Sequence, residues 1–177
     1  IMTGTPVEKI VVENGVAKKI VLPNDTIELQ KDDLVVCGLP SYIVPKIIVG
    51  LPTQLANNLS SIDYAANICV VIGIEEKLTD YYWVNTIGDF PFGTIIDQNN
   101  LYGDGEFPWR VYYISTYCNR DDPILKLSDE KIFKQYMNYF EKIFQKKINV
   151  LWYRVNKTPV GGAIEKMGLF DMIPTND

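Results

Sequence analysis

The sequence predicts an α+β fold, in which a small β-meander is followed by a mixed or antiparallel sheet covered by one long amphipathic helix. Three observations support this class. Short β-branched runs alternate with turn signals over the first forty residues, longer apolar and aromatic runs follow, and one later segment repeats its apolar residues with helical spacing. With 177 residues, 47% of them hydrophobic, the chain is long enough to bury a core.

The meander is predicted by two turns. Asn14-Gly15 separates two β-branched runs and favours a type I′ turn, whose two central residues both have positive φ. Pro23-Asn24-Asp25 supplies the second turn, which gives three short strands. The run 34–37 is continuously apolar and ends at Gly38-Leu39-Pro40, as is typical of a strand buried on both faces. We therefore expect its partner sheet to lie outside this sequence.

The later elements follow from local patterns. Short helices are predicted within residues 41–49 and 53–61, and a long helix within residues 129–146, where Ser128 is a good N-cap. The aromatic face of the long helix needs no ligand and is predicted to cover the sheet; it comprises Phe133, Tyr136, Phe140 and Phe144. Apolar, β-branched and aromatic runs predict the strands, at residues 67–74, 81–84, 94–96, 109–116 and 150–155.

Composition excludes several classes of protein. The net charge of −5 argues against nucleic acid and anionic membranes as partners. No apolar run approaches the roughly eighteen residues that span a bilayer, and no signal peptide opens the chain. Cys37, Cys69 and Cys118 are widely spaced and fit no metal-ligand pattern, so we expect reduced structural thiols and a cytoplasmic protein.

The chain contains no histidine. Ser-His-Asp and Cys-His catalysis therefore cannot be built from its residues alone, and neither can a His-based zinc site. Acid–base chemistry near neutral pH would need a carboxylate, lysine, tyrosine or cysteine with a perturbed pKa.

Three motifs carry a family resemblance: Thr5-x-Val7-x-x-Ile10, Asn14-Gly15, and Asp33-x-Val35-Val36-x-x-x-Pro40. In this order they resemble the FAD-dependent amine oxidase and protoporphyrinogen oxidase superfamily, and the likeness continues through most of the chain. The resemblance implies FAD as the cofactor and a reaction in which the flavin takes a hydride or acts without net redox change.

Two glycine-rich segments of that superfamily are missing from this sequence, the Gly-x-Gly-x-x-Gly fingerprint and the segment that returns to the flavin. We therefore expect an internal or truncated piece, inactive and unable to hold FAD tightly by itself. Residues 1–40 would be a meander and the last strand of an otherwise missing FAD domain. Residues 41–157 would form the substrate-side domain, and residues 158–177 an irregular tail.

The resemblance also indicates cofactor contacts. Val7 matches the position whose backbone amide and carbonyl meet the adenine edge of FAD, although it is equally a plain strand residue. Gly38, Leu39 and Pro40 match the turn where a buried strand passes the dinucleotide, or they simply end that strand.

The residues themselves indicate candidates for substrate binding. Strand alternation would place Tyr81 and Trp83 on one face, as aromatic walls of a pocket or as part of the core. Trp152 and Tyr153 present the same two alternatives. Further candidates are two arginines and one loop. Arg110 and Arg154 interrupt apolar strands and would bind an anionic group or lie on a solvated face, and Asp97 with Asn99 and Asn100 would bind a sugar or cation or cap a loop.

Two functions remain open. The chain is either the substrate-binding portion of an FAD-dependent oxidoreductase or a complete α+β binding module whose tyrosine-rich sheet takes a carbohydrate or a protein. The first interpretation is favoured because the run 34–37 needs a neighbouring sheet. It implies a missing FAD-binding domain and a small-molecule substrate as partners, and self-association when that domain is absent.

Overall fold

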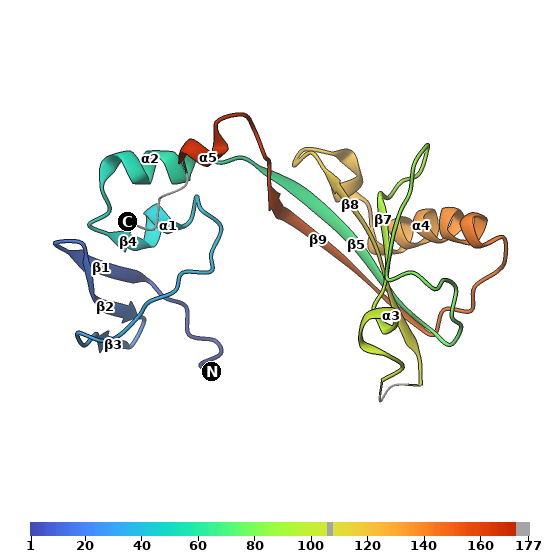
Figure 1. Cartoon of the computed structure of the whole chain (residues 1–177), viewed down its shortest axis with the longest axis horizontal. Coiled ribbons are helices and arrows are strands. Elements are labelled where there is room, and N and C mark those ends of the chain that lie inside the picture. Colours follow the sequence, from blue (N-terminus) through green and yellow to red (C-terminus); the bar gives the residue numbers. More distant parts are fainter. Residues whose placement is uncertain (106–107, 173–177) are drawn as a thin grey trace. The chain divides into compact units, whose positions relative to one another are not determined.

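The computed structural model describes residues 1–105 and 108–172, which fold into two compact units (Figure 1). Unit 1 comprises Ile1–Asp63 with the described part of Ile164–Asp177, and unit 2 comprises Tyr64–Ala163. Each unit contains a sheet with helices, so the predicted α+β class is confirmed. The division expected at residues 40 and 157 differs from these units, because residues 41–63 belong to unit 1 and residues 158–163 to the last strand of unit 2.

Unit 1 is built on a four-stranded sheet in the order β3-β2-β1-β4. Its strands are β1 (Lys9–Glu13), β2 (Val16–Leu22), β3 (Asp25–Glu28) and β4 (Ile48–Val49). The predicted meander is confirmed as β1 to β3, which pair antiparallel in sequence order. Asn14 and Gly15 have φ of 51° and 77°, as a type I′ turn requires. The sheet is mixed, because β4 pairs in parallel with β1.

The helices of unit 1 are short: α1 (Val44–Ile47), α2 (Thr53–Ser61) and α5 (Leu169–Met172). The helix predicted within residues 41–49 is shorter than that segment. Pro45 lies in its first turn, where a proline is tolerated, and Ile48 is already extended and begins β4. The helix predicted at residues 53–61 is confirmed as α2.

The prediction of a buried strand at residues 34–37 is wrong for this chain. The segment is neither helix nor strand, and the side chains of Leu34 and Val36 are 86% and 82% exposed. Val35 and Cys37 between them are half-buried. The apolar run alone could not reveal this outcome, because a strand forms only where another strand offers hydrogen-bond partners, and no described strand pairs with this segment.

Unit 2 is built on a five-stranded antiparallel sheet in the order β6-β7-β8-β5-β9. Its strands are β5 (Tyr64–Ile74), β6 (Trp83–Asn85), β7 (Thr94–Asp97), β8 (Arg110–Cys118) and β9 (Trp152–Ala163). β5 and β9 run side by side as the two longest strands (Figure 1). All five strands predicted for this region are present, although β6 begins later than expected and β9 ends later.

The extension of β9 replaces the first part of the predicted irregular tail. Its pairing with β5 continues to Tyr64↔Ala163, past a register shift opposite Ala65 to Asn67. Gly161 lies against β5 at this irregularity, so that a Cβ placed there would stand 2.4 Å from the Cβ of Asn67. Gly161 and Gly162, which predict an irregular tail in the sequence, therefore permit a bulge within a strand.

The remaining helices of unit 2 are α3 (Asn99–Tyr102), a 3₁₀ turn (Pro123–Lys126) and the sixteen-residue α4 (Asp129–Phe144). α4 begins where predicted: the Ser128 hydroxyl accepts a hydrogen bond from the Lys131 amide at 3.4 Å. It ends two residues earlier than expected, because Gln145 adopts a left-handed conformation with φ of 53°.

α4 packs against one face of this sheet (Figure 1), and together they form the core of unit 2. The helix contributes Ile132, Tyr136, Met137 and Phe140, all buried. Alternate residues of β5 meet them: Ile68, Val70, Ile72 and Ile74. Each fully buried side chain of this size stabilises the fold by about 1.5–3 kcal/mol, so the pairing of this helix with this sheet face dominates the stability of the unit.

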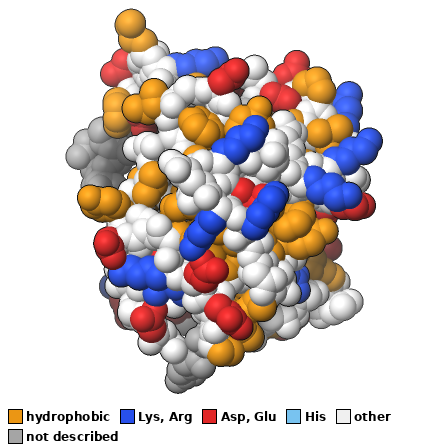
Figure 2. Space-filling view, turned by 90° about the vertical axis from the view of Figure 1, so that its right-hand side faces the viewer, with side chains coloured by type: hydrophobic (Ala, Val, Ile, Leu, Met, Phe, Trp, Pro, Cys, Tyr) orange, Lys and Arg blue, Asp and Glu red, His pale blue; other side chains and the backbone are white. Residues whose placement is uncertain are grey.

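The outer surface of α4 is charged in both signs. Lys134 pairs with Glu130 at 2.6 Å, and Lys157 of β9 pairs with Asp129 at 2.9 Å. The face of the molecule in Figure 2 likewise shows acidic and basic side chains interspersed. Exposed pairs of this kind contribute about 0–1 kcal/mol each, so this surface solvates the helix and presents no field of one sign.

Candidate functional site

The face of the unit 2 sheet that points away from α4 is the candidate site, and we call it the open face. Because side chains alternate along a strand, the residues between the core positions of β5 lie there, starting with Asn67 and Cys69. The register continues the face onto the neighbouring strands, where Asn67 lies opposite Tyr117 of β8 and Thr158 of β9, and Cys69 lies opposite Ser115. Five strands thus present one continuous polar and aromatic surface.

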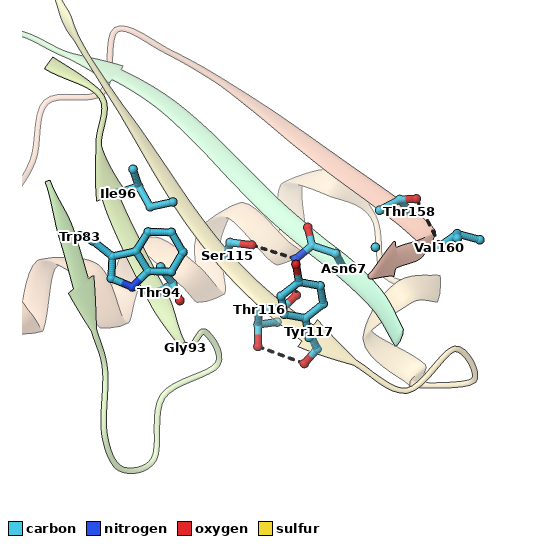
Figure 3. A pocket seen from close by; sticks show the side chains of 11 residues that line it. Asn67, Trp83, Gly93, Thr94, Ile96, Ser115, Thr116, Tyr117, Thr158 and Val160 are labelled. Carbon is cyan, nitrogen blue, oxygen red and sulfur yellow. Dashed lines mark hydrogen bonds between the residues drawn. The ribbon is translucent and has the colours of Figure 1, made fainter. Parts of the chain in front are cut away.

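A hollow of about 340 Å³ lies on the open face (Figure 3). Figure 3 shows the Trp83 indole on one side of it and the Tyr117 ring on the other, with Ser115 between them and Asn67 beside Tyr117. The other lining residues come mainly from β7 to β9: Gly93, Thr94, Ile96, Thr116, Thr158, Val160 and Gly161. None of the eleven lining residues carries a formal charge.

The orientation of Trp83 is fixed within its own strand. It pairs with Ile96 in the register, and its indole N–H donates a hydrogen bond to the Asn85 side-chain oxygen at 2.7 Å. Trp83 and Asn85 share one face of the sheet because they are two positions apart in β6. This is the open face, since Asn85 pairs with Thr94 and Thr94 pairs with Ser115. The indole is 52% exposed, which leaves a large aromatic surface available to a ligand.

The side chain of Asn67 is held by two hydrogen bonds. Its amide nitrogen donates to the Ser115 hydroxyl and to the Thr116 carbonyl, each at 2.9 Å. A carbonyl can only accept, so this contact fixes which end of the amide is nitrogen. Asn67 is the polar interruption in the apolar run of β5, and this interruption was the available sequence signal for a site residue.

Three of the residues predicted to bind substrate lie on or beside the open face. Trp152 covers Gly73, where an added Cβ would stand 2.1 Å from the indole nitrogen, and its ring meets Trp109 edge-on at 6.5 Å. Arg154 lies opposite Val71 and is exposed. The third is Trp83. Tyr81 lies outside β6 and is 71% exposed, so strand alternation does not place it with Trp83.

The other two predicted residues, Arg110 and Tyr153, lie on the face that packs against α4. Tyr153 stacks on Phe133 of the helix, with ring centroids 3.8 Å apart. Arg110 is 7% exposed, and its guanidinium pairs with the fully buried Asp97 at 3.1 Å. It also donates to Asn100 at 2.8 Å and contacts Asp104, so both terminal nitrogens of the guanidinium already bind groups of the protein.

The hydrogen bonds of this network hold the loops in place, and they involve Asp97, Asn99 and Asn100. Asp97 accepts from the Asn99 amide at 3.1 Å, and the Asn100 side chain donates to the carbonyls of Thr79 and Tyr81 at 2.9 and 3.1 Å. These are the bonds of a loop cap. Within the described residues, no group of three or more acidic, cysteine or histidine side chains is placed to hold a metal ion.

Burial shifts the pKa of two groups near the site. It raises the pKa of Tyr112 to about 12, with a hydrogen bond to Asp97 acting in the same direction. Burial also raises the pKa of the Cys69 thiol, although a hydrogen bond with Ser115 opposes the change. Cys69 therefore carries its proton near neutral pH and is a poor nucleophile.

The four residues predicted to contact FAD lie in unit 1, and two local features fit that expectation. Val7 lies outside β1, and its amide and carbonyl take part in no hydrogen bond with the described backbone. Gly38 fronts open space, since a Cβ added there would meet nothing within 4 Å. Leu39 is 46% exposed and Pro40 is half-buried.

Comparison with known proteins gives one family and a consistent set of structures. UDP-galactopyranose mutase in its reduced form superposes with a TM-score of 0.69 at 12% identity, covering 96% of this chain and 37% of the mutase. A protein of Exiguobacterium sp. 255-15 assigned as a protoporphyrinogen oxidase gives 0.65 at 15% identity, covering 95% and 37%. A double mutant of putrescine oxidase gives 0.62 at 13% identity, covering 85% and 33%.

At these identities the structures show a shared fold, and the chain spans less than two fifths of the length of each. No curated protein matches the sequence. No helix in the described part of the chain combines the length and apolar character needed to cross a bilayer. The model of the family described as flavin-containing amine oxidoreductases matches residues 1–165. The chain therefore belongs to the flavin-containing amine oxidoreductase family.

Proposed function

We propose that this chain is the substrate-binding portion of an FAD-dependent oxidoreductase and that the open face of unit 2 forms one wall of the substrate cavity. The observation that carries the proposal is the hollow between Trp83 and Tyr117. Ligand sites combine apolar walls with a few oriented polar groups, and this hollow has both. The opposite face of the same sheet is filled by α4, so only the open face is available.

Unit 1 would contribute the edge of the FAD-binding domain. The unpaired backbone of Val7 and the space beside Gly38 are compatible with a dinucleotide. The exposed apolar side chains of Leu34 and Val36 are compatible with a neighbouring strand of that domain, which would complete the ladder that residues 34–37 lack here. Without that domain, the chain would be inactive.

In this assignment the residues of unit 2 bind and orient the substrate. Trp83 would cover it and exclude water, Asn67 would accept a hydrogen bond from it, and Trp152 would extend the aromatic wall. Exposed Arg154 would meet an anionic group of a longer substrate. FAD, when bound, supplies the electron acceptor, and no side chain of this face needs to act as a nucleophile.

The test uses the natural gene product that contains this chain, purified with its flavin. Trp83→Ala should change the visible absorbance and fluorescence of the bound FAD, because an aromatic side chain beside the isoalloxazine alters its electronic environment. Tyr82→Ala is the matched control, since Tyr82 is the adjacent aromatic residue and does not line the hollow.

Equal flavin spectra in wild type and Trp83→Ala would refute the proposal that the open face forms a wall of the cavity beside the flavin. A gene product that binds no flavin but binds a sugar or protein through the open face would instead support the binding-module function. The neutral aromatic hollow is the observation that keeps this second function open.

A further inference from the structure

The hollow on the open face has a chemical character that selects among substrates. Its polar groups are the Asn67 amide, the Trp83 indole N–H, backbone groups and five hydroxyls, and none of its eleven lining residues is charged. The hydroxyls are those of Thr94, Ser115, Thr116, Tyr117 and Thr158. Arg154 is a cation on the open face of the same strand, β9. It lies four residues before Thr158, which corresponds to about 13 Å along the strand from the hollow. The hollow therefore offers hydrogen bonds without a counter-charge.

Asn67 is the oriented acceptor of this hollow. Both of its N–H groups are used, one on the Ser115 hydroxyl and one on the Thr116 carbonyl. Its side-chain oxygen accepts no hydrogen bond from any residue in the described ranges 1–105 and 108–172. The bulge of β9 keeps Gly161 close against the Cβ of Asn67, which restricts movement of the side chain. The oxygen acceptor is thus held beside the Tyr117 ring, with the Trp83 indole across the hollow (Figure 3).

The absence of charge makes ionic ligands costly here. An ammonium or phosphate group that enters the hollow gives up part of its hydration and finds no opposite formal charge there. The faces of Trp83 and Tyr117 offer an ammonium a cation–π contact of only about 0.5–1 kcal/mol, because both rings are more than half exposed. A hydroxyl group loses far less on burial and regains it by donating to a fixed acceptor. The rings of Trp83 and Tyr117 cover the apolar faces of such a ligand.

We propose that this hollow binds an uncharged, hydroxyl-bearing ring, such as a pyranose, and that the Asn67 oxygen accepts a hydrogen bond from one of its hydroxyls and determines specificity. The role of this ring as part of a substrate rests on the proposed function above. The selectivity for neutral over ionic groups is a property of the hollow itself.

The experiment titrates the 177-residue chain, labelled with ¹⁵N, with three probes: methyl β-D-galactopyranoside, putrescine and glucose 6-phosphate. The readout is the indole N–H resonance of Trp83, assigned by its loss in Trp83→Phe. We expect the neutral galactoside to shift this resonance saturably, and putrescine and glucose 6-phosphate to leave it in place at the same concentrations. An equal or tighter response to either ionic probe, or no response to any probe, would overturn the proposal.

Asn67→Asp tests the named residue, because it keeps the shape of the side chain and adds a charge. Binding of the galactoside should weaken by about tenfold, because the new carboxylate oxygen meets the Thr116 carbonyl, which is also an acceptor, and the side chain loses its orientation, while putrescine should gain affinity. Ser115→Ala is the matched control, since it keeps the Asn67 oxygen, and its selectivity should remain that of wild type. Unchanged selectivity in Asn67→Asp would exclude Asn67 as the determinant.

The titration of the wild-type chain with the three probes tests the selectivity for neutral over ionic ligands, even if Asn67→Asp does not fold. The two proposals also fail separately. Loss of flavin binding by the longer gene product would refute the oxidoreductase function and leave the selectivity of the hollow intact. Binding of ionic probes here would refute the selectivity and leave the oxidoreductase function intact.

Discussion

Two buried tyrosines of unit 2 show how single hydroxyl groups affect this fold. Tyr112 and Tyr136 are both fully buried on the helix side of the sheet. The Tyr112 hydroxyl accepts a hydrogen bond from the Leu78 amide at 2.9 Å, whereas the Tyr136 hydroxyl has no hydrogen-bond partner among the described residues. Burial costs both groups their hydration, and only Tyr112 recovers it.

The two phenylalanine variants should therefore differ in sign. Tyr136→Phe should raise the free energy of unfolding by about 1 kcal/mol, because it removes an unsatisfied hydroxyl, and Tyr112→Phe should lower it by about 1–3 kcal/mol. Urea unfolding followed by near-UV circular dichroism measures both. A destabilised Tyr136→Phe would mean that its hydroxyl has a partner in solution.

The same tyrosines predict weaker folding at alkaline pH. Burial, and secondly Asp97, raise the pKa of Tyr112 to about 12 from an ordinary 10.0, so the folded chain keeps a proton that the unfolded chain releases. This stabilisation is fully present below about pH 10 and is lost as the pH rises through 12. The free energy of unfolding should fall by about 2–3 kcal/mol over this range because of Tyr112. Burial also raises the pKa of Tyr136, which acts in the same direction.

Unfolding free energies measured across this pH range should fall in wild type and fall less steeply in Tyr112→Phe. Equal slopes in the two proteins would show that Tyr112 titrates normally in the folded state.

At the scale of the element, the contact between β5 and β9 depends on a glycine. Gly73→Ala would place its Cβ 2.1 Å from the Trp152 indole nitrogen, so the ring must move away from the sheet and from Trp109. We expect a loss of about 1–3 kcal/mol in stability and a changed tryptophan fluorescence spectrum. In the control Gly93→Ala, the added Cβ meets nothing within 4 Å, and stability should be nearly unchanged. Similar effects in both variants would refute the packing of Trp152 on Gly73.

The elements also show what the sequence could predict and why. The Asn14-Gly15 hairpin, the Ser128 cap and the apolar strand 67–74 depend on local chemistry, and each is present. Strand 34–37 and the irregular tail depend on partners that local patterns do not reveal. Residues 34–37 pair with no described strand, and Gly161 of the predicted tail lies against Asn67.

The site shows the same limit. Trp152 and Tyr153 were both candidates for substrate binding, but the register places Trp152 on the open face and Tyr153 on the face toward α4. The sequence predicts Arg110 as a ligand for an anionic group, but its guanidinium pairs with Asp97, thirteen residues earlier in the chain. Asn67 was overlooked because an isolated amide in a strand gives no motif, and its bonds to β8 exist only in the folded sheet.

At the scale of the whole molecule, the exposed apolar run of unit 1 predicts self-association. Leu34 and Val36 expose most of their side chains on a segment that no described strand pairs with. The 177-residue chain should therefore sediment with a concentration-dependent mass, and Leu34→Lys with Val36→Lys should restore a monomer. Ile87→Lys is the control, because Ile87 is 93% exposed in unit 2 and should leave the association unchanged. A sharp monomer at every concentration of wild type would contradict this prediction.

We propose that these two units belong to an FAD-dependent oxidoreductase, and the family match over residues 1–165 supports this proposal. The most direct test is to express the complete natural reading frame that contains residues 1–177 and to measure FAD released per polypeptide. We expect a stoichiometric flavin in that product, and a folded product that neither retains nor takes up FAD would refute the oxidoreductase function.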